Sequence, residues 1–121
     1  MRNLDLECAK LGRELAEGDG KVVDEKVLTA ALGVLEEQGP YACFLYLIAR
    51  EGALGKRLTT QAAQFLKKIL SPRNGEQDPL QYVQSIAENL DHLLFARDLL
   101  RQAFVYARYH AKARGSAGGK E

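Results

Sequence analysis

Four basic side chains recur at helical spacing near the end of the 121-residue chain. They are Arg97, Arg101, Arg108 and Lys112. In a helix of 3.6 residues per turn these positions fall within a sector of roughly 60° and span about 22 Å. Guanidinium groups pair with phosphate oxygens in a bidentate geometry and need no particular base. The pattern predicts a basic surface for a polyanion, and the alternative is an ordinary solvated face of a bundle helix.

Further basic residues would widen this surface if the preceding helix lies beside it. They are Lys56, Arg57, Lys67, Lys68 and Arg73. Tyr106 and Tyr109 share the last helix with the basic stripe. We interpret them first as core or rim aromatics and second as platforms on which bases stack.

Histidines and cysteines, the residues best suited to catalysis or metal binding, are few and scattered. His92 and His110 are 18 positions apart on the predicted last helix, which separates them by roughly 27 Å and prevents a shared metal ion. Cys8 and Cys43 have no CxxC spacing, and Cys43 lies in the most apolar run, so both are expected to be reduced core thiols. The sequence predicts no active site, no metal site and no cofactor.

Paired carboxylates also lack a catalytic setting. Asp24 with Glu25 and Glu36 with Glu37 fall at predicted helix ends, where solvation and the helix dipole explain them without an acid or base role.

Length and composition indicate one ordinary globular domain, with 46% apolar and 27% charged residues. The longest apolar run, residues 41–49, is well short of the roughly 18 to 20 residues that cross a bilayer. The N-terminus alternates charged and apolar residues and lacks a secretion signal. We therefore expect a cytoplasmic protein without membrane contact.

The formal net charge of +1 is unevenly distributed. Residues 1–40 carry five Lys or Arg against nine Asp or Glu, whereas residues 41–121 carry twelve against seven. This asymmetry favours head-to-tail contact between copies of the chain, or an anionic partner for its later part; the alternative is chance scatter of solubilising charge.

Apolar periodicity and capping residues predict an all-α fold, a single-domain bundle of about five to six helices. Asp78, Pro79 and Gln81 form the clearest helix start, a capping box with a first-turn proline. Gly39 and Pro40 mark a helix end followed directly by a new start. The helices are expected at residues 3–16, 24–37, 41–51 (in the middle of the bundle), 60–70, a short one from 79, and a long one from about 89 to 113. The bundle domain is thus residues 1–113, and residues 114–121 are expected to be a flexible tail.

Three stretches of the sequence resemble the small subunit of Cmr-type (type III-B) CRISPR-Cas effector complexes. They are ALGVLEEQGPYACFLYL at residues 31–47, LLFARDLL at residues 93–100 and YARYHAKA at residues 106–113. The expected order and length of the helices agree with that family over nearly the whole chain.

The resemblance implies a helical bundle without enzymatic activity, stacked in more than one copy inside a ribonucleoprotein. Its partners would be the RAMP-type backbone subunit, the large polymerase-like subunit, further copies of itself, and the guide RNA with its target RNA. The family touches mainly RNA backbone. From the helix geometry we assign Arg97, Arg101, Arg108 and Lys112 as RNA-binding candidates, with Lys67, Lys68 and Arg57 beside them.

Two other classes of protein remain open. Residues 58–66 read like the start of a helix-turn-helix, so an all-helical DNA-binding regulator is one alternative. However, the helix that would enter the groove has no run of Arg, Asn and Gln at its start. The second alternative is a helical adaptor that binds only protein, with the basic stripe contacting an acidic partner.

Overall fold

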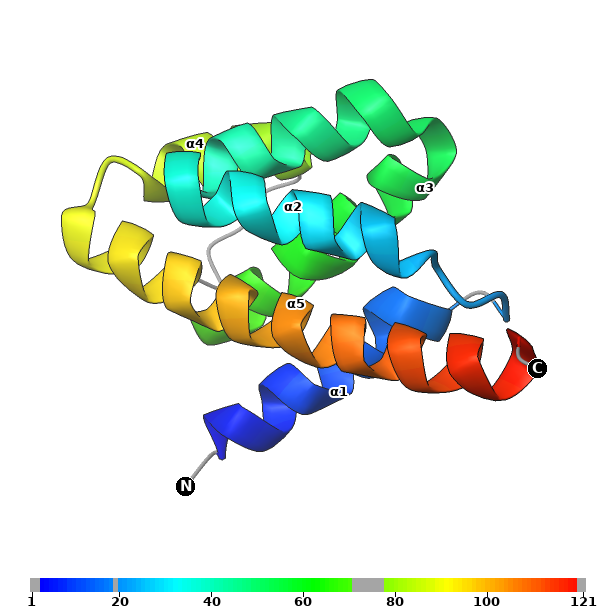
Figure 1. Ribbon diagram of the computed structural model, residues 1–121. Helices are drawn as coiled ribbons and strands as arrows, with labels where there is room; N and C mark the ends of the chain where they lie inside the picture. Colours follow the sequence, from blue (N-terminus) through cyan, green and yellow to red (C-terminus); the bar gives the residue numbers. More distant parts are fainter. Residues whose placement is uncertain (1–2, 19, 71–77, 120–121) are drawn as a thin grey trace.

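The computed structural model describes residues 3–18, 20–70 and 78–119, with side chains as far as Arg114. Within these ranges the chain forms five helices and no strand. They are α1 (Leu4–Glu17), α2 (Glu25–Gln38), α3 (Pro40–Ile69), α4 (Pro79–Ile86) and α5 (Leu90–Gly119), packed as one bundle (Figure 1). The predicted all-α bundle of about five to six helices is confirmed. The described residues form five helices, or six if the two halves of α3, which run in opposite directions, are counted separately.

Local capping explains where most of the helices begin. The Asp24 side chain accepts a hydrogen bond from the Lys26 amide (2.9 Å) at the start of α2. The predicted capping box of α4 is present, with Asp78 accepting from the Gln81 amide and the Gln81 side chain accepting from the Asp78 amide. These side chains satisfy amides that have no partner within their own helix.

The reversal of α3 depends on two glycines. Gly52 has φ 57° and ψ −126°, a conformation that side-chain-bearing residues rarely adopt, and it turns the chain back on itself (Figure 1). A Cβ on Gly55 would overlap the carbonyl oxygen of Leu47, so the two halves can approach this closely only with glycine there. The sequence predicted a break from Gly52 and a new helix from residue 60. That expectation was wrong for residues 53–59, which are helical, because Gly52 alone completes the turn.

The predicted break near Asn89 separates α4 from α5, and the Asn89 side chain accepts from the His92 amide (3.0 Å). The expected helix end near Ala113 was wrong, since α5 continues to Gly119. Once a helix is formed, each further residue adds a hydrogen bond at little cost, so glycines near its end need not stop it. Two expected features lie outside the described residues: the end of the tail, at residues 120–121, and the loop at residues 71–75.

The core is centred on α5, not on the segment expected in the middle. Tyr41 and Leu45 in the first half of α3 are 43% and 46% exposed. In α5 the buried stripe is rich in small residues: Ala96, Ala103, Ala107 and Ala111, with Leu100 and Phe104 between them.

This small-residue stripe lets α1 approach α5 closely. A Cβ on Gly12 would lie 2.5 Å from Tyr106 Cβ and 2.8 Å from the Ala103 carbonyl oxygen. Gly12 therefore marks the point where α1 crosses α5. At the far end of α1, Glu17 pairs with Arg114 (3.1 Å) and ties the two helices together.

None of the described helices is long and apolar enough to cross a membrane.

Candidate nucleic-acid interface

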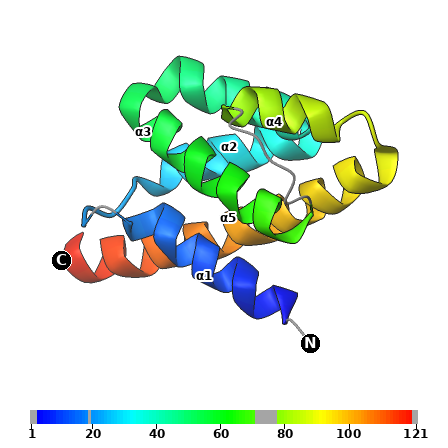
Figure 2. The ribbon, with the colours of Figure 1, turned by 180° about the vertical axis from the view of Figure 1, so that it is seen from behind.

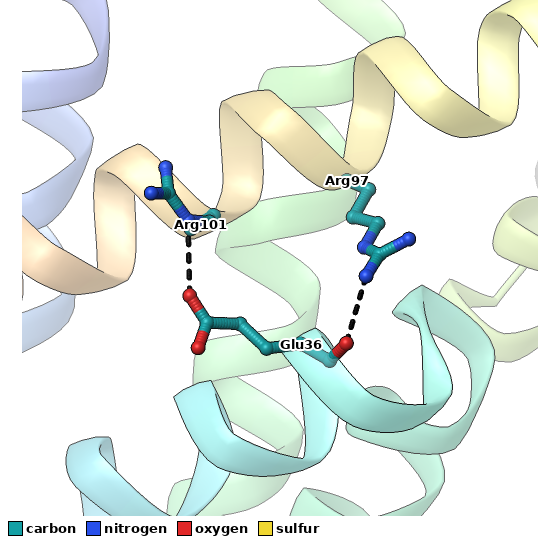
Figure 3. A network of polar contacts seen from close by, with 3 residues as sticks. All are labelled: Glu36, Arg97 and Arg101. Carbon is teal, nitrogen blue, oxygen red and sulfur yellow. Dashed lines mark hydrogen bonds and ion pairs between the residues drawn. The ribbon is translucent and has the colours of Figure 1, made fainter.

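The three arginines of the basic stripe of α5 lie along the edge of α2 and remain partly exposed. Arg97 Nη2 donates to the main-chain carbonyl oxygen of Glu36 (2.7 Å), and Arg101 Nε donates to the Glu36 carboxylate (2.9 Å). Figure 3 shows both guanidinium groups reaching from α5 toward this one residue. A cation near the C-terminus of a helix is stabilising. The last turn of α2 contains no basic residue, and Arg97 of α5 supplies this charge.

A second pair of an arginine with a glutamate lies two turns further along α5. Arg108 Nη2 lies 3.7 Å from a carboxylate oxygen of Glu25, at the start of α2. Glu25 and Glu36 are separated by the same eleven positions as Arg97 and Arg108. The two helices therefore run antiparallel, as their ribbons show in Figure 1. The glutamates of α2 face the arginines of α5. Lys112, the last member of the stripe, is exposed.

These contacts use only part of each guanidinium group. Glu36 engages Nε of Arg101 and Nη2 of Arg97, and the other nitrogens have no partner among the described residues. In Figure 3 the terminal nitrogens of Arg101 point away from Glu36. The side chain of Arg101 is 53% exposed and that of Glu36 47%, so the remaining donors reach solvent. Glu36 thus orients two cations, Arg101 through its carboxylate and Arg97 through its main-chain carbonyl oxygen, and it neutralises only Arg101.

The residues expected to widen the stripe do not join it. Arg57 donates to the carbonyl oxygens of Glu14 (3.0 Å) and Leu15 (3.1 Å) at the end of α1, so it caps that helix. The ammonium of Lys67 lies over the ring of Tyr82, 5.4 Å from its centroid. The second half of α3, which carries both residues, lies behind α2 and α5 in Figure 1 and faces the viewer in Figure 2. The expectation that it would extend the basic face of α5 was wrong, and Arg73 lies outside the described residues.

Lys68 belongs to a separate, half-open hollow of about 540 Å³ between α1 and the second half of α3. Its lining mixes both charges with amides and two apolar side chains: Glu7, Lys10, Leu11, Glu14, Gln61, Gln64, Phe65 and Lys68. Because two glutamates and two lysines line it, this hollow does not concentrate charge of one sign.

The two thiols are buried and hydrogen-bonded. Cys43 Sγ donates to the Ala31 carbonyl oxygen (3.4 Å), and Cys8 Sγ donates to that of Leu99 (3.6 Å). Burial raises the pKa of Cys43 to about 12 and that of Cys8 to about 11, where Asp5 and Glu7 add to the effect. Both remain protonated at neutral pH, which makes them poor nucleophiles and poor metal ligands.

His110 Nδ1 lies 3.9 Å from Glu17, in the cluster that joins the ends of α1 and α5. In the part of the chain that the structure describes, no three His, Cys, Asp or Glu side chains come together to hold a metal ion.

Sequence reasoning found the arginines of the interface but missed the acids that hold them. Glu25 and Glu36 were interpreted as solvated residues at helix ends, whereas both pair with α5. The two glutamates are eleven positions apart, whereas the arginines that pair with them, Arg101 and Arg108, are seven apart, so sequence spacing gave no signal for the pairing.

Comparisons of the chain with protein-family models, with curated proteins and with solved structures found no match.

Proposed function

We propose that this chain is a non-catalytic, RNA-binding small subunit of a type III-B (Cmr) CRISPR-Cas effector complex in the cytoplasm. It would contact the backbone of guide RNA and target RNA together with the RAMP-type backbone subunit, the large polymerase-like subunit and copies of itself. The proposal rests on the resemblance at residues 31–47, 93–100 and 106–113 and on the basic edge of α5.

The observation that carries the proposal is the way Glu36 holds Arg97 and Arg101. A phosphate ligand is best bound by guanidinium groups that are already oriented, because long side chains otherwise lose rotamer freedom on binding. Glu36 fixes both side chains through one nitrogen each and leaves donors toward solvent. Arg108 and Lys112 continue this edge along α5.

A basic helix edge suits the duplex of guide and target RNA. Double-stranded RNA is recognised mostly by its shape and by contacts to phosphates and 2′-hydroxyls, which require positioned donors and no active site. Arg97, Arg101, Arg108 and Lys112 are the residues we assign to this role. Arg57 is excluded from the assignment because it caps α1, and Lys67 and Lys68 because they lie on the other face.

The proposal is tested by purifying the tagged chain from its native cells at moderate salt, sequencing the RNA and identifying the proteins that copurify. We expect CRISPR guide RNA and RAMP-type subunits to be recovered. The Arg97→Gln/Arg101→Gln double variant should keep the protein subunits and recover less target RNA, whereas Arg13→Gln on the exposed face of α1 removes a cation elsewhere and should change nothing. Recovery of duplex DNA, or of unrelated proteins without guide RNA, would refute the proposal.

A second candidate, a helical adaptor that binds only protein, is favoured by exposed apolar side chains at the start of α5. Leu90 is 65% exposed and Leu94 46%. They lie on the same side of α5 as Arg97, Leu90 two turns and Leu94 one turn before it. Absence of any RNA affinity at low salt, together with a partner captured through Leu90 and Leu94, would select the adaptor.

The helix-turn-helix alternative has no support in the geometry. Residues 58–66 lie inside the continuous second half of α3, and most of their side chains are in the core. A recognition helix must instead present its side chains to the groove.

A further inference from the structure

The first turns of α5 carry large apolar side chains that the fold leaves uncovered. Leu90 is 65% exposed, Leu94 46% and Phe95 38%. They lie where α5 begins, at one edge of the bundle in both views (Figures 1 and 2). Contact of such side chains with water is unfavourable, and neighbouring exposed apolar residues mark sites where another molecule docks. The start of α5 is therefore a candidate contact surface.

Two carboxylates flank the apolar pair Leu94 and Phe95. Asp91 precedes this pair by three and four positions, and Asp98 follows it by four and three. Residues at these spacings are neighbours on a helix surface, so α5 presents an acid, an apolar pair and a second acid along two turns, about 10 Å. Both carboxylates are exposed, and neither pairs with a cation in the part of the chain that the structure describes.

The charge around this surface is also negative. Residues 79–98 contain three Asp or Glu, of which Glu88 is the third, against one Lys or Arg. That one cation is Arg97, which already donates to the main-chain carbonyl oxygen of Glu36. The second half of α5 differs, because residues 99–114 contain no acid. The start of α5 therefore repels RNA phosphates and attracts a cationic partner.

A pair of acids on α1 has the same spacing without the apolar side chains. Glu7 and Glu14 are also seven positions apart, and Lys10 and Leu11 lie between them. Leu11 is only 3% exposed, and Lys10 provides a cation within the same surface. The α1 pair therefore offers neither an apolar anchor nor uncompensated negative charge, and it serves as an internal control for the pair on α5.

We propose that the start of α5 is a docking surface for a basic amphipathic helix of another protein. The apolar side chains of that helix pack on Leu90, Leu94 and Phe95. Two of its Lys or Arg residues, one turn before and one turn after its apolar pair, reach Asp91 and Asp98. The same surface of a second copy does not fit here, because its acids would face these acids. The docking surface goes beyond the proposed RNA-binding function and does not depend on it.

The test uses the purified full chain at physiological salt and two fluorescently labelled helical peptides as probes. Both peptides carry a central pair of leucines, flanked one turn before and one turn after by lysines in one peptide and by glutamates in the other. The unmodified chain should prefer the lysine peptide, and the charge-reversed Asp91→Lys/Asp98→Lys variant the glutamate peptide. Each preference should be roughly tenfold, because two ion pairs replace two like-charge contacts.

The control variant reverses the matched pair on α1. Glu7→Lys/Glu14→Lys changes the net charge by the same amount and should keep the preference of the unmodified chain for the lysine peptide. Leu94→Ser removes an apolar contact and should weaken binding of the lysine peptide. Circular dichroism verifies folding, and Asp98→Asn, which should also bind the lysine peptide more weakly, replaces the charge-reversed variant if that variant does not fold.

Photo-crosslinking in native cells tests the chemistry of the natural partner. A photoreactive amino acid in place of Leu94 should crosslink to a segment of another protein in which Lys or Arg residues flank apolar ones. A crosslink to RNA or to a second copy, no crosslinked protein, or equal affinity of the unmodified chain for both peptides would overturn the proposal. RNA binding is measured with variants of Arg97 and Arg101, so the docking surface and the proposed function can fail separately.

Discussion

Gly55 lies directly against the carbonyl oxygen of Leu47, so the second half of α3 folds back onto the first without any side chain between them. We expect Gly55→Ala to destabilise the protein by about 2 to 3 kcal/mol, because the added Cβ meets main-chain atoms that cannot move aside cheaply. Urea unfolding followed by circular dichroism measures the change.

Gly33→Ala is the matched control, since it adds the same methyl group where no described atom is near. It should stabilise the protein by up to about 1 kcal/mol. Equal effects of the two substitutions would show that the close approach at Gly55 is not a constraint on the fold.

Arg57 is predicted to act on stability and not on RNA binding. Its guanidinium donates to the carbonyl oxygens of Glu14 and Leu15 and to Gln61 Oε1 (2.9 Å). Removing these charge-assisted bonds in Arg57→Gln should cost about 2 kcal/mol, measured by urea unfolding. Lys56→Gln removes the same charge from the neighbouring exposed residue and should leave stability within about 0.5 kcal/mol. A loss of RNA affinity specific to a folded Arg57→Gln protein would contradict the assignment.

The buried thiol of Cys43 predicts a loss of stability in alkali. Burial raises its pKa from 9.0 to about 12, so above pH 9 the unfolded chain releases a proton that the folded chain retains. The contribution is fully present below pH 9 and is lost as the pH rises toward 12, by up to about 1.4 kcal/mol per pH unit for one proton. Cys43→Ala should therefore reduce the slope of unfolding free energy against pH in this window. Parallel curves for the two proteins would refute the prediction.

Asp5 links the start of α1 to α5 by accepting hydrogen bonds from the Tyr106 hydroxyl (2.9 Å) and the Gln102 amide. The hydrogen bond to Asp5, with desolvation and the carboxylate charge, raises the pKa of Tyr106 above its ordinary value of 10.0. Asp5→Asn should lower that pKa toward 10, because the amide carries no charge to repel the tyrosinate. Ultraviolet titration of tyrosinate tests this, with Tyr106→Phe identifying the transition. An unchanged Tyr106 transition in Asp5→Asn would contradict the contact.

The parts of the fold that depend on local chemistry could be predicted from the sequence. Asp24, Asp78 and Asn89 cap helices close to where the sequence placed them, because capping needs only the side chain and nearby amides. The course of residues 53–59 could not be predicted in this way. Both a loop and a helix are compatible with glycines at 52 and 55, and the choice depends on the tertiary contact between Gly55 and Leu47.

In the candidate site, too, one part could be predicted from the sequence and another part depends on tertiary contacts. Helical periodicity placed Arg97, Arg101 and Arg108 on one face of α5, and the described contacts confirm that these residues share an edge. Periodicity does not say which helix covers that edge. The neighbouring helix proved to be α2, so two of the arginines pair with its carboxylates instead of standing free in solvent. Lys67 and Lys68 fell on the opposite side for the same reason, because the path of α3 is set by its reversal at Gly52.

We propose that the guanidinium nitrogens of Arg97 and Arg101 that do not contact Glu36 bind RNA phosphates. It is tested most directly by measuring the affinity of the purified chain for an RNA duplex over a range of salt concentrations. For Arg97→Gln/Arg101→Gln we predict weaker binding and a slope of log affinity against log salt that is smaller by about 2, since each lost phosphate contact removes roughly one unit. Arg13→Gln should leave both unchanged. Absence of RNA binding at low salt, or an equal loss in Arg13→Gln, would contradict the claim.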